Sequence, residues 1–200
     1  HLRQPWRVLL GAALLLALLL VPYVRFRMLH PEAVAYHLRT LDSYWLKPLP
    51  LSQKLAMFGQ TYLQGLSPLY WFLPNNVDLV RHQMKGMGHL SVLALPFALL
   101  GVGVCLWRWR SPAHRVVLAA TLAAPFSAAL VAVLIPRVLF MVVPAALLMS
   151  LGLEQVVAWL RQPRRQAIFT YGSAAIVCVL SFTMLRSALT DGPTWFSDYG

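Results

Sequence analysis

Residues 138–160 read VLFMVVPAALLMSLGLEQVVAWL, and this run decides the fold class. Its only charged residue is Glu154, near the far end. An α-helix needs roughly 20 apolar residues to cross about 30 Å of hydrocarbon. Lipid offers no hydrogen-bond partner for an open backbone, so a spanning segment is expected to be a helix. The run therefore predicts a transmembrane helix.

Four further apolar stretches resemble this run, at residues 8–24, 90–107, 116–135 and 167–185. The chain is 59% hydrophobic and only 12% charged, whereas soluble domains are about 25% charged. One such stretch could be the buried helix of a soluble domain, but 200 residues offer too little interior for five. We expect an all-α polytopic membrane protein with about five transmembrane helices.

The charge pattern predicts the orientation of the chain. The short connections 108–115 and 161–166 each carry three arginines, and the stub before residue 8 carries Arg3 and Arg7. The connection Pro136-Arg137 carries one. Short cationic loops remain cytoplasmic, and tryptophans gather at membrane boundaries. The tryptophans expected at this inner boundary are Trp6, Trp107, Trp109 and Trp159.

Four parts follow from this orientation. Residues 1–24 are a cytoplasmic stub with the first transmembrane helix, 25–89 an extracytoplasmic loop, 90–185 a four-helix transmembrane region, and 186–200 an extracytoplasmic tail. We expect a multi-pass protein of the plasma (inner) membrane with a cytoplasmic N-terminus. Because the sequence starts with His1 and ends abruptly after a helix, we also expect a fragment of a longer protein.

The formal net charge of +11 reflects this topology more than a nucleic-acid partner. In the outer loop, however, seven lysines and arginines oppose three acids, Glu32, Asp42 and Asp78. Such an excess favours an anionic ligand or lipid headgroup.

The loop divides into three pieces. Residues 31–45 predict a short helix that opens with Pro31 and Glu32, and the Lys-Pro-Leu-Pro stretch at 47–50 ends it. Residues 52–66 predict an amphipathic helix. This helix either lies flat on the membrane surface or packs against the transmembrane bundle. Its predicted apolar stripe is Leu51, Leu55, Phe58, Tyr62 and Leu66.

The third piece, residues 67–89, reads SPLYWFLPNNVDLVRHQMKGMGH. Tyr70 and Trp71 precede a turn, and the cations Arg81, His82 and Lys85 follow it. Cations neutralise phosphate oxygens, and flat rings can cover the faces of sugars. These residues favour binding of a lipid-linked phosphate that carries a sugar. The alternative is an aromatic interface anchor whose cations bind anionic lipids.

The third piece and the helix after it, with its Leu-Pro-Phe-Ala-Leu-Leu-Gly pattern at 95–101, resemble bacterial polytopic glycosyltransferases of the GT-C fold. This class includes lipid A aminoarabinose transferases and protein O-mannosyltransferases. Ile135-Pro136-Arg137, followed by a helix with Pro144, looks like the arginine-then-proline helix of that class. The similarity spans roughly residues 6–185 and rests on hydropathy order and short motifs. One departure is Val138, where the class often has an aromatic residue.

The resemblance implies transfer of a sugar from a polyprenyl-phosphate donor to a lipid or glycan acceptor of the cell envelope. The catalytic aspartate would lie in a first extracytoplasmic loop ahead of His1. Arg81, Lys85 and Arg137 would stabilise charge on the departing phosphate, His82 would contact the ligand, and Tyr70 and Trp71 would border the sugar or the lipid entrance. Arg137 could instead extend to outer headgroups, and His89 is either a phosphate donor or structural.

Two other function classes remain open: a transporter or channel subunit, and a non-catalytic membrane scaffold. Asp42 and Asp78 are expected to be solvated, and Glu154 to pair with Arg161. The pairs His30/His37 and His82/His89 are seven residues apart and could each share a helix face. Tight His-x-x-x-His or Cys-x-x-Cys spacing and a nucleotide-binding glycine loop are missing, so we expect no metal and no cofactor. We also expect no nucleic acid. Cys105 and Cys178 are expected to be buried and unpaired.

Overall fold

A computed structural model describes residues 6–79, 82–84 and 86–190 of the chain. These residues form helices and turns, with no strand among them, which confirms the predicted all-α class. The chain divides into two compact units, His1–Pro48 and Leu49–Gly200. The boundary falls inside the predicted extracytoplasmic loop, directly after Lys47 and Pro48.

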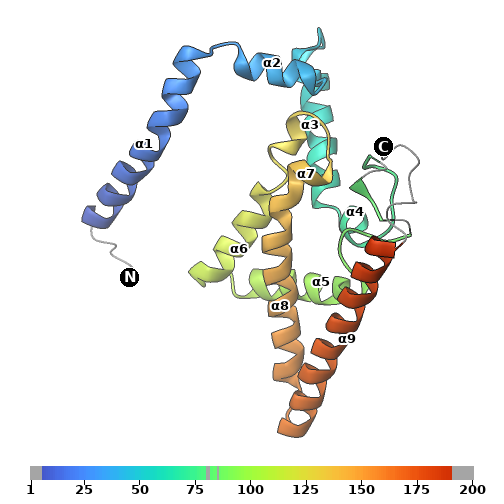
Figure 1. Cartoon of the computed structure of the whole chain (residues 1–200). Coiled ribbons are helices and arrows are strands. Elements are labelled where there is room, and N and C mark those ends of the chain that lie inside the picture. Colours follow the sequence, from blue (N-terminus) through green and yellow to red (C-terminus); the bar gives the residue numbers. More distant parts are fainter. Residues whose placement is uncertain (1–5, 80–81, 85, 191–200) are drawn as a thin grey trace. The chain divides into compact units, whose positions relative to one another are not determined.

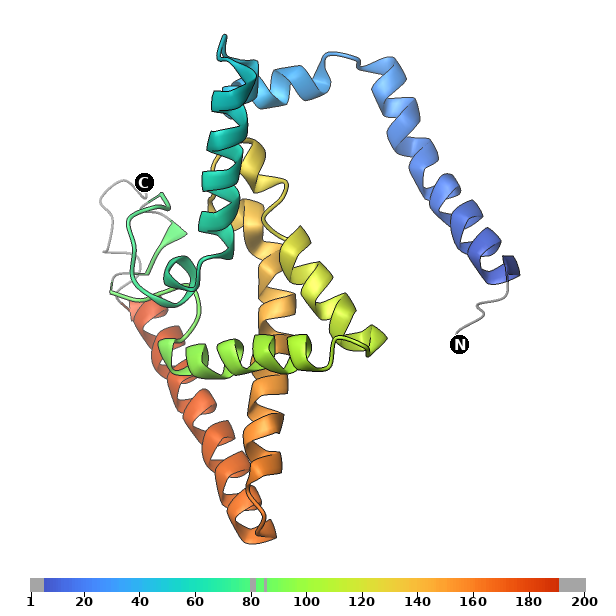
Figure 2. The same cartoon turned by 180° about the vertical axis from the view of Figure 1, so that it is seen from behind.

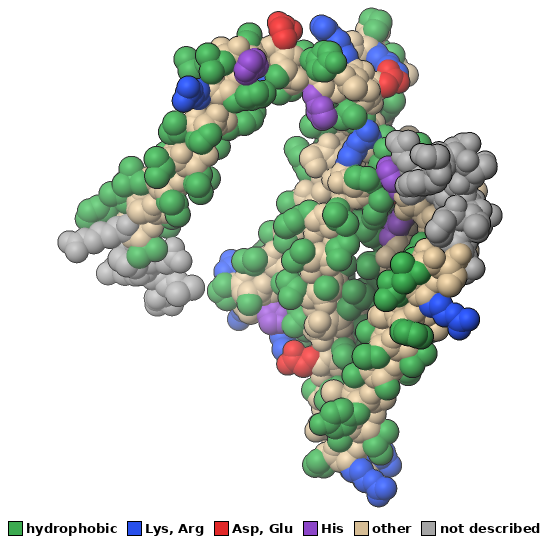
Figure 3. All heavy atoms as spheres, in the orientation of Figure 1, with side chains coloured by type: hydrophobic (Ala, Val, Ile, Leu, Met, Phe, Trp, Pro, Cys, Tyr) green, Lys and Arg blue, Asp and Glu red, His purple; other side chains and the backbone are tan. Residues whose placement is uncertain are grey.

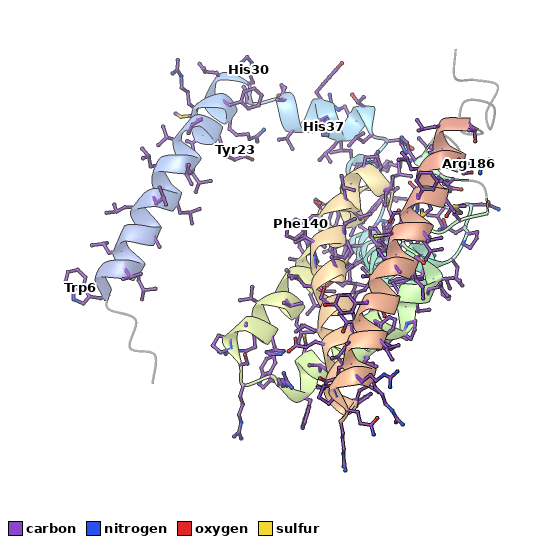
Figure 4. The ribbon with its side chains drawn as sticks, turned by 60° about the horizontal axis from the view of Figure 1, so that its bottom comes forward. Trp6, Tyr23, His30, His37, Phe140 and Arg186 are labelled. Atoms are coloured by element: carbon purple, nitrogen blue, oxygen red, sulfur yellow. The ribbon has the colours of Figure 1, made fainter. Side chains whose placement is uncertain are left out.

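The first unit contains α1 (Trp6–Leu29), α2 (Ala33–Thr40) and the 3-10 helix η1 (Tyr44–Leu46). Helix α1 continues past the predicted end at residue 24, so Arg25 and Arg27 lie within it. Arginine is a good helix former, and the Arg27 side chain donates to the Pro31 carbonyl just beyond the helix. Figure 4 labels Trp6 and Tyr23 on α1.

The second unit begins with α3 (Leu51–Leu66), α4 (Pro68–Phe72), the 3-10 helix η3 (Val92–Ala94) and α5 (Leu95–Trp107). It continues with α6 (Pro112–Ala123), η4 (Ala128–Leu130), α7 (Ile135–Val138), η5 (Leu139–Met141), α8 (Val142–Trp159) and α9 (Pro163–Thr190). Figures 1 and 2 show α8 running along this unit with α5 crossing it.

Four segments of the described chain are long and apolar enough to cross a membrane: Val8–Leu29, Pro112–Leu130, Ile135–Trp159 and Pro163–Thr190. The fifth predicted stretch forms a shorter apolar helix, Val92–Trp107. It starts later than the predicted residue 90 because the Leu90 N–H donates to the Trp71 carbonyl and Pro96 lies in the first turn of α5. Proline is tolerated in a first turn, where its missing N–H is not needed.

Helices α5 and α8 make the most extensive contact in the described part of the chain. Glycines allow this approach: a Cβ at Gly101 would lie 1.9 Å from the Leu148 carbonyl oxygen, and one at Gly152 would lie 2.0 Å from the Phe97 carbonyl oxygen. Small residues at helix crossings let the backbones approach closely when lipid supplies no hydrophobic driving force. By contrast, Gly103 faces open space.

The predicted amphipathic helix forms as α3, and its second half packs against the end of α6 and the turn that follows it. The Tyr62 hydroxyl donates to the Leu122 carbonyl at 2.8 Å, and the rings of Phe58 and Phe126 meet edge to face. A Cβ on Gly65 would lie 2.5 Å from that of Pro125. The first half of the predicted stripe is not used in this contact, since Leu51 and Leu55 are exposed.

Helix α6 ends at Ala123, earlier than the predicted residue 135, with Ala124 as its C-cap and Pro125 next. Proline lacks the N–H that continues a helix. The next residues form η4 and an extended residue, Leu134, before α7 begins. Arg137 therefore lies in the first turn of a helix, where the sequence analysis had placed a connection.

Most of the surface along α8 and α9 is hydrophobic, and lysines and arginines gather at the end where these two helices meet (Figure 3). Helix α9 has no buried residue, and Cys178 on it is exposed, whereas Cys105 is buried. The expectation of burial is thus wrong for Cys178, because α9 leaves that face unpacked. Such apolar, unpacked helix surfaces are typical of a protein surrounded by lipid.

Candidate functional site

Residues 73–89, here called the histidine loop, follow α4, and the structure describes residues 73–79, 82–84 and 86–89 of them. At its start, the Asn75 side chain donates to the Tyr70 carbonyl and accepts from the Val77 N–H. At its end, the Leu90 N–H reaches the Trp71 carbonyl at 2.8 Å. Compact loops whose ends lie close together are frequently functional.

Asp78 lies at the centre of this arrangement, with a side chain that is 0% exposed. The Tyr70 hydroxyl donates to its Oδ2 at 2.6 Å, and the Ile135 N–H donates to its Oδ1 at 2.8 Å. One carboxylate thus joins α4, the histidine loop and the first residue of α7. The expectation that Asp78 is a solvated acid is wrong, because this fold surrounds it with donors.

Two histidines face the same carboxylate. His89 Nε2 lies 3.1 Å from Asp78 Oδ2, and His82 Nδ1 lies 4.0 Å from Oδ1. The His82 side chain is 24% exposed and the His89 side chain 11%. Neither nitrogen is aligned for a hydrogen bond within the described residues. At these distances, a protonated imidazole would be attracted to the Asp78 carboxylate by its charge.

Burial raises the pKa of the Tyr70 phenol well above its ordinary value of 10.0. The hydrogen bond to Asp78 and the charge of that carboxylate raise it further. Both effects favour the neutral phenol, because an anion beside a carboxylate would be doubly penalised. Tyr70 is therefore a permanent hydrogen-bond donor to Asp78 at neutral pH.

The structure buries both aromatic residues that the sequence analysis placed at the border of a sugar site. Tyr70 and Trp71 belong to the hydrophobic core, and the Trp71 indole N–H donates to the Gly65 carbonyl at 2.7 Å. Their rings also pack against the His89 ring, with centroids 5.1 and 6.1 Å away. Their ring faces are used in packing within the protein. The role of these two residues at a sugar or lipid entrance stays a prediction.

Trp71 also lines an apolar cavity of about 90 Å³ between the histidine-loop region and the helices. Phe72, Leu90, Leu95 and Met141 form other parts of its wall. The volume is enough for a few carbon atoms of a chain but not for a whole lipid. Because Trp71 both lines this cavity and packs against the His89 ring, the cavity lies close to the cluster around Asp78.

Arg137 follows Ile135 by two residues and is half-buried. Its Nη1 donates to the Ala132 carbonyl at 3.2 Å, so the side chain turns back along its own segment. Arg81 and Lys85 lie outside the described residues. The structure therefore brings together Tyr70, Trp71 and His82 from the predicted set, through Asp78 and His89, whereas Arg137 is linked to them only through the backbone of Ile135.

Sequence reasoning missed Asp78 and gave His89 only a minor role. One available signal was the environment of Asp78, which stands between Val77 and Leu79 with His82 four residues later. An acid inside an apolar run is rarely solvated unless the run is exposed. A histidine four residues away would then have been a candidate partner.

The cluster and the arginine-rich turns occupy opposite ends of α7–α8. Asp78 binds the first residue, Ile135, whereas the turn with Arg161 follows Trp159 at the other end. At 1.5 Å per residue, the segment Ile135–Trp159 spans roughly 35 Å. The Arg108 turn is also near the far end, since Arg108 Nη2 lies 3.4 Å from Gln155 Oε1. The two cationic turns thus share one end, and the cluster occupies the other.

Within the described residues, no group of three or more His, Cys, Asp or Glu side chains is arranged to hold a metal ion. His30 follows α1 and His37 lies in α2, as labelled in Figure 4, so they do not share one helix face. Glu154 is exposed on α8, and no ion pair with Arg161 occurs among the described residues. The predicted pairing of these two residues is not observed.

No family model, no curated protein and no solved structure matches the chain. The geometry of the site and the resemblance described above are therefore the basis of the functional proposal.

Proposed function

We propose that this chain belongs to a membrane glycosyltransferase that moves a sugar from a polyprenyl-phosphate donor to a cell-envelope acceptor at the extracytoplasmic face. The chain supplies the side of the site that binds the donor lipid. Tyr70, Asp78, His82 and His89 form the centre of this site, and Arg137 borders it.

One observation carries the proposal. A carboxylate–histidine cluster lies at one end of α7–α8, and the arginine-rich turns lie at the other, roughly 35 Å away. If the arginine turns remain cytoplasmic, the cluster lies at the opposite face of the membrane. Lipid-linked sugars present their phosphate at that depth, with the sugar in water and the chain in hydrocarbon.

The surroundings of the cluster fit the two parts of such a donor. Histidine and arginine side chains can donate hydrogen bonds to phosphate oxygens. The apolar cavity behind Trp71 can accept a few carbons of the lipid chain. Arg81 and Lys85, which precede and follow the described residues 82–84, add two further cations to the same loop.

The chemical role follows from the reaction. The acceptor hydroxyl attacks the anomeric carbon of the sugar, the bond from that carbon to the phosphate oxygen breaks, and the lipid phosphate leaves with the electron pair. Cations around the leaving phosphate stabilise the charge that develops in the transition state. In the class that the chain resembles, an aspartate of the first extracytoplasmic loop takes the hydroxyl proton. None of the residues assigned here has that role.

The proposal is tested by sugar transfer in membranes that contain the full protein. His82→Ala and Arg137→Ala should each lower the transfer rate at least tenfold at equal expression, because each removes a donor to the phosphate. Arg110→Ala is the matched control: Arg110 is exposed in the turn between α5 and α6, at the cytoplasmic end. It should change the rate less than twofold.

Sidedness is tested independently by cysteine labelling. A protein with Cys105→Ser and Cys178→Ser receives a single cysteine at position 82, and an impermeant maleimide is added to intact cells. Labelling only after the cells are opened would place residue 82 in the cytosol. That result, or unchanged transfer in both alanine variants, would overturn the proposal in favour of a transporter subunit or a scaffold.

A further inference from the structure

We infer that Asp78 is the positioning residue of this site, which orients the imidazoles of His82 and His89 as hydrogen-bond donors to the phosphate of an isoprenoid phosphate. The inference rests on the proposed function for the choice of ligand. The role of Asp78 itself rests on the geometry of the cluster.

Asp78 is a fully buried carboxylate. A carboxylate with 0% exposure has lost its water shell and needs compensation from hydrogen bonds and opposite charge. Tyr70 and the Ile135 N–H supply two neutral donors. Both ion pairs of Asp78 within the described residues are with histidine. The buried carboxylate is thus enclosed by a phenol, a backbone N–H and two imidazole rings.

The imidazole rings of His82 and His89 are both oriented toward Asp78. His82 turns Nδ1 toward Asp78, and His89 turns Nε2 toward it. Each ring therefore directs its other nitrogen, Nε2 of His82 and Nδ1 of His89, away from the carboxylate. A carboxylate behind a histidine fixes which nitrogen faces a ligand and how the ring is oriented. His82 is the more exposed of the two, so its Nε2 is the first contact for an incoming anion.

Asp78 is also linked by a hydrogen bond to the start of α7. Because Asp78 accepts from the Ile135 N–H, it also fixes the first turn of the helix that carries Arg137. Asp78 thereby connects the two histidines to the start of the helix that carries Arg137, whose own side chain donates to the Ala132 carbonyl.

The neighbouring cavity selects the source of the phosphate. Trp71 lines the apolar cavity, and its ring also packs edge to face against the His89 ring, with centroids 6.1 Å apart. A ligand with a phosphate at the histidines and a short apolar segment behind Trp71 would use both compartments. Inorganic phosphate would use only the first.

The experiment measures binding to the purified full chain in lipid nanodiscs with three probes: farnesyl phosphate, farnesol and inorganic phosphate. We expect farnesyl phosphate to bind at least tenfold more tightly than either of the others. Asp78→Asn should raise its dissociation constant about tenfold. Asp42→Asn, the matched control at an exposed acid of the other unit, should change it less than twofold.

A second measurement separates positioning from general stability. Nitrogen-15 chemical shifts of the imidazole rings of His82 and His89 report ring tautomer and charge directly. They should change in Asp78→Asn but not in Asp42→Asn, at a temperature where circular dichroism shows all variants folded. If Asp78→Asn does not fold, Tyr70→Phe serves instead, because it removes one donor to Asp78 and leaves every charge in place. That variant should raise the dissociation constant severalfold.

Each contrary result has a defined meaning. Unchanged affinity and unchanged ring shifts in the Asp78 or Tyr70 variant overturn the positioning role alone, while the proposed function stands. Equal affinity for inorganic and farnesyl phosphate overturns the lipid part of the inference. A wild-type protein that binds neither phosphate overturns both the ligand proposed here and the donor-binding role in the proposed function.

Discussion

Two regions of the molecule share a short sequence pattern and use it differently. Tyr44-Trp45 in the first unit and Tyr70-Trp71 in the second each follow a capping serine, and both tyrosines are buried. An aspartate lies near each pair, yet the Asp42 side chain is 84% exposed and bound to Lys47 at 2.8 Å. Asp78 is fully buried and bound to the tyrosine itself.

The difference shows that local pattern does not decide the environment of a charge. Asp42 lies in a left-handed turn (φ +53) at the end of α2, where its side chain reaches solvent. Asp78 lies in a loop that is closed by backbone contacts and covered by the start of α7. A surface ion pair contributes little to stability, whereas removal of a buried hydrogen-bonded charge leaves its partners unsatisfied. The comparison therefore predicts unequal effects of matched substitutions.

The largest difference is expected between the two aspartates. Asp78→Ala leaves the Tyr70 hydroxyl and the Ile135 N–H without an acceptor, which should lower the free energy of unfolding by roughly 3 kcal/mol. Asp42→Asn, in which asparagine also tolerates the left-handed backbone, should cost less than about 1 kcal/mol. Reversible unfolding in mixed detergent, followed by circular dichroism, measures both. Equal losses would contradict the contrast.

The closure of the histidine loop is tested at its two glycines. A Cβ on Gly88 would lie 2.5 Å from the Phe72 carbonyl carbon, a backbone atom that cannot yield, so Gly88→Ala should cost about 2 kcal/mol. Gly86 has open space around it but a φ of +72, so Gly86→Ala should cost only about 1 kcal/mol of backbone strain. The same unfolding measurement applies. A larger loss at Gly86 would show that the loop does not close against Phe72.

The two tyrosines sharpen the comparison without a change of charge. Tyr70→Phe removes a donor to a buried carboxylate and should lower the free energy of unfolding by about 1.5 kcal/mol. The nearby carboxylate of the first unit, Asp42, is instead exposed and bound to Lys47, so Tyr44→Phe should cost about 1 kcal/mol or less. Both variants keep the ring and its packing, which makes each the control of the other. A larger loss for Tyr44→Phe than for Tyr70→Phe would contradict the stabilising role of the hydrogen bond to Asp78.

The smallest effect is expected in alkaline solution. Because the folded pKa of Tyr70 is raised above its ordinary value of 10.0, the unfolded chain releases the phenol proton first as the pH rises. The stabilisation is complete below pH 10 and declines above it, by about 1 kcal/mol at pH 11. Unfolding curves from pH 9 to 11 should decline less steeply for Tyr70→Phe than for the wild type. Parallel curves would mean that Tyr70 ionises equally in both states.

Much of the fold could be predicted from the sequence because apolar length and charge bias act locally. The helical class and the helices formed by 8–24, 138–160 and 167–185 were predicted correctly apart from their ends. The predicted stretch 116–135 corresponds to the candidate span Pro112–Leu130, in which the α-helix ends at Ala123 and a 3-10 turn follows Pro125. The stretch 90–107 forms a shorter helix, since the backbone near Leu90 is bound to Trp71.

The candidate site was less predictable. Tyr70 and His82 were identified, but as open ligand contacts rather than parts of a buried cluster. The partners of Asp78 come from α4, from the histidine loop and from Ile135, which is separated from it by more than fifty residues of sequence. Sequence periodicity does not report contacts over that distance.

The sequence by itself determined that the chain is helical and apolar enough for a membrane, and it located the arginine turns that bias its orientation. These properties depend on composition and on neighbours within one or two helical turns. Only the tertiary structure decided that Asp78 is an interior charge and Asp42 an exterior one. Burial depends on which distant segments pack over a residue, and here that is the start of α7 meeting a loop closed by Gly88 and Leu90.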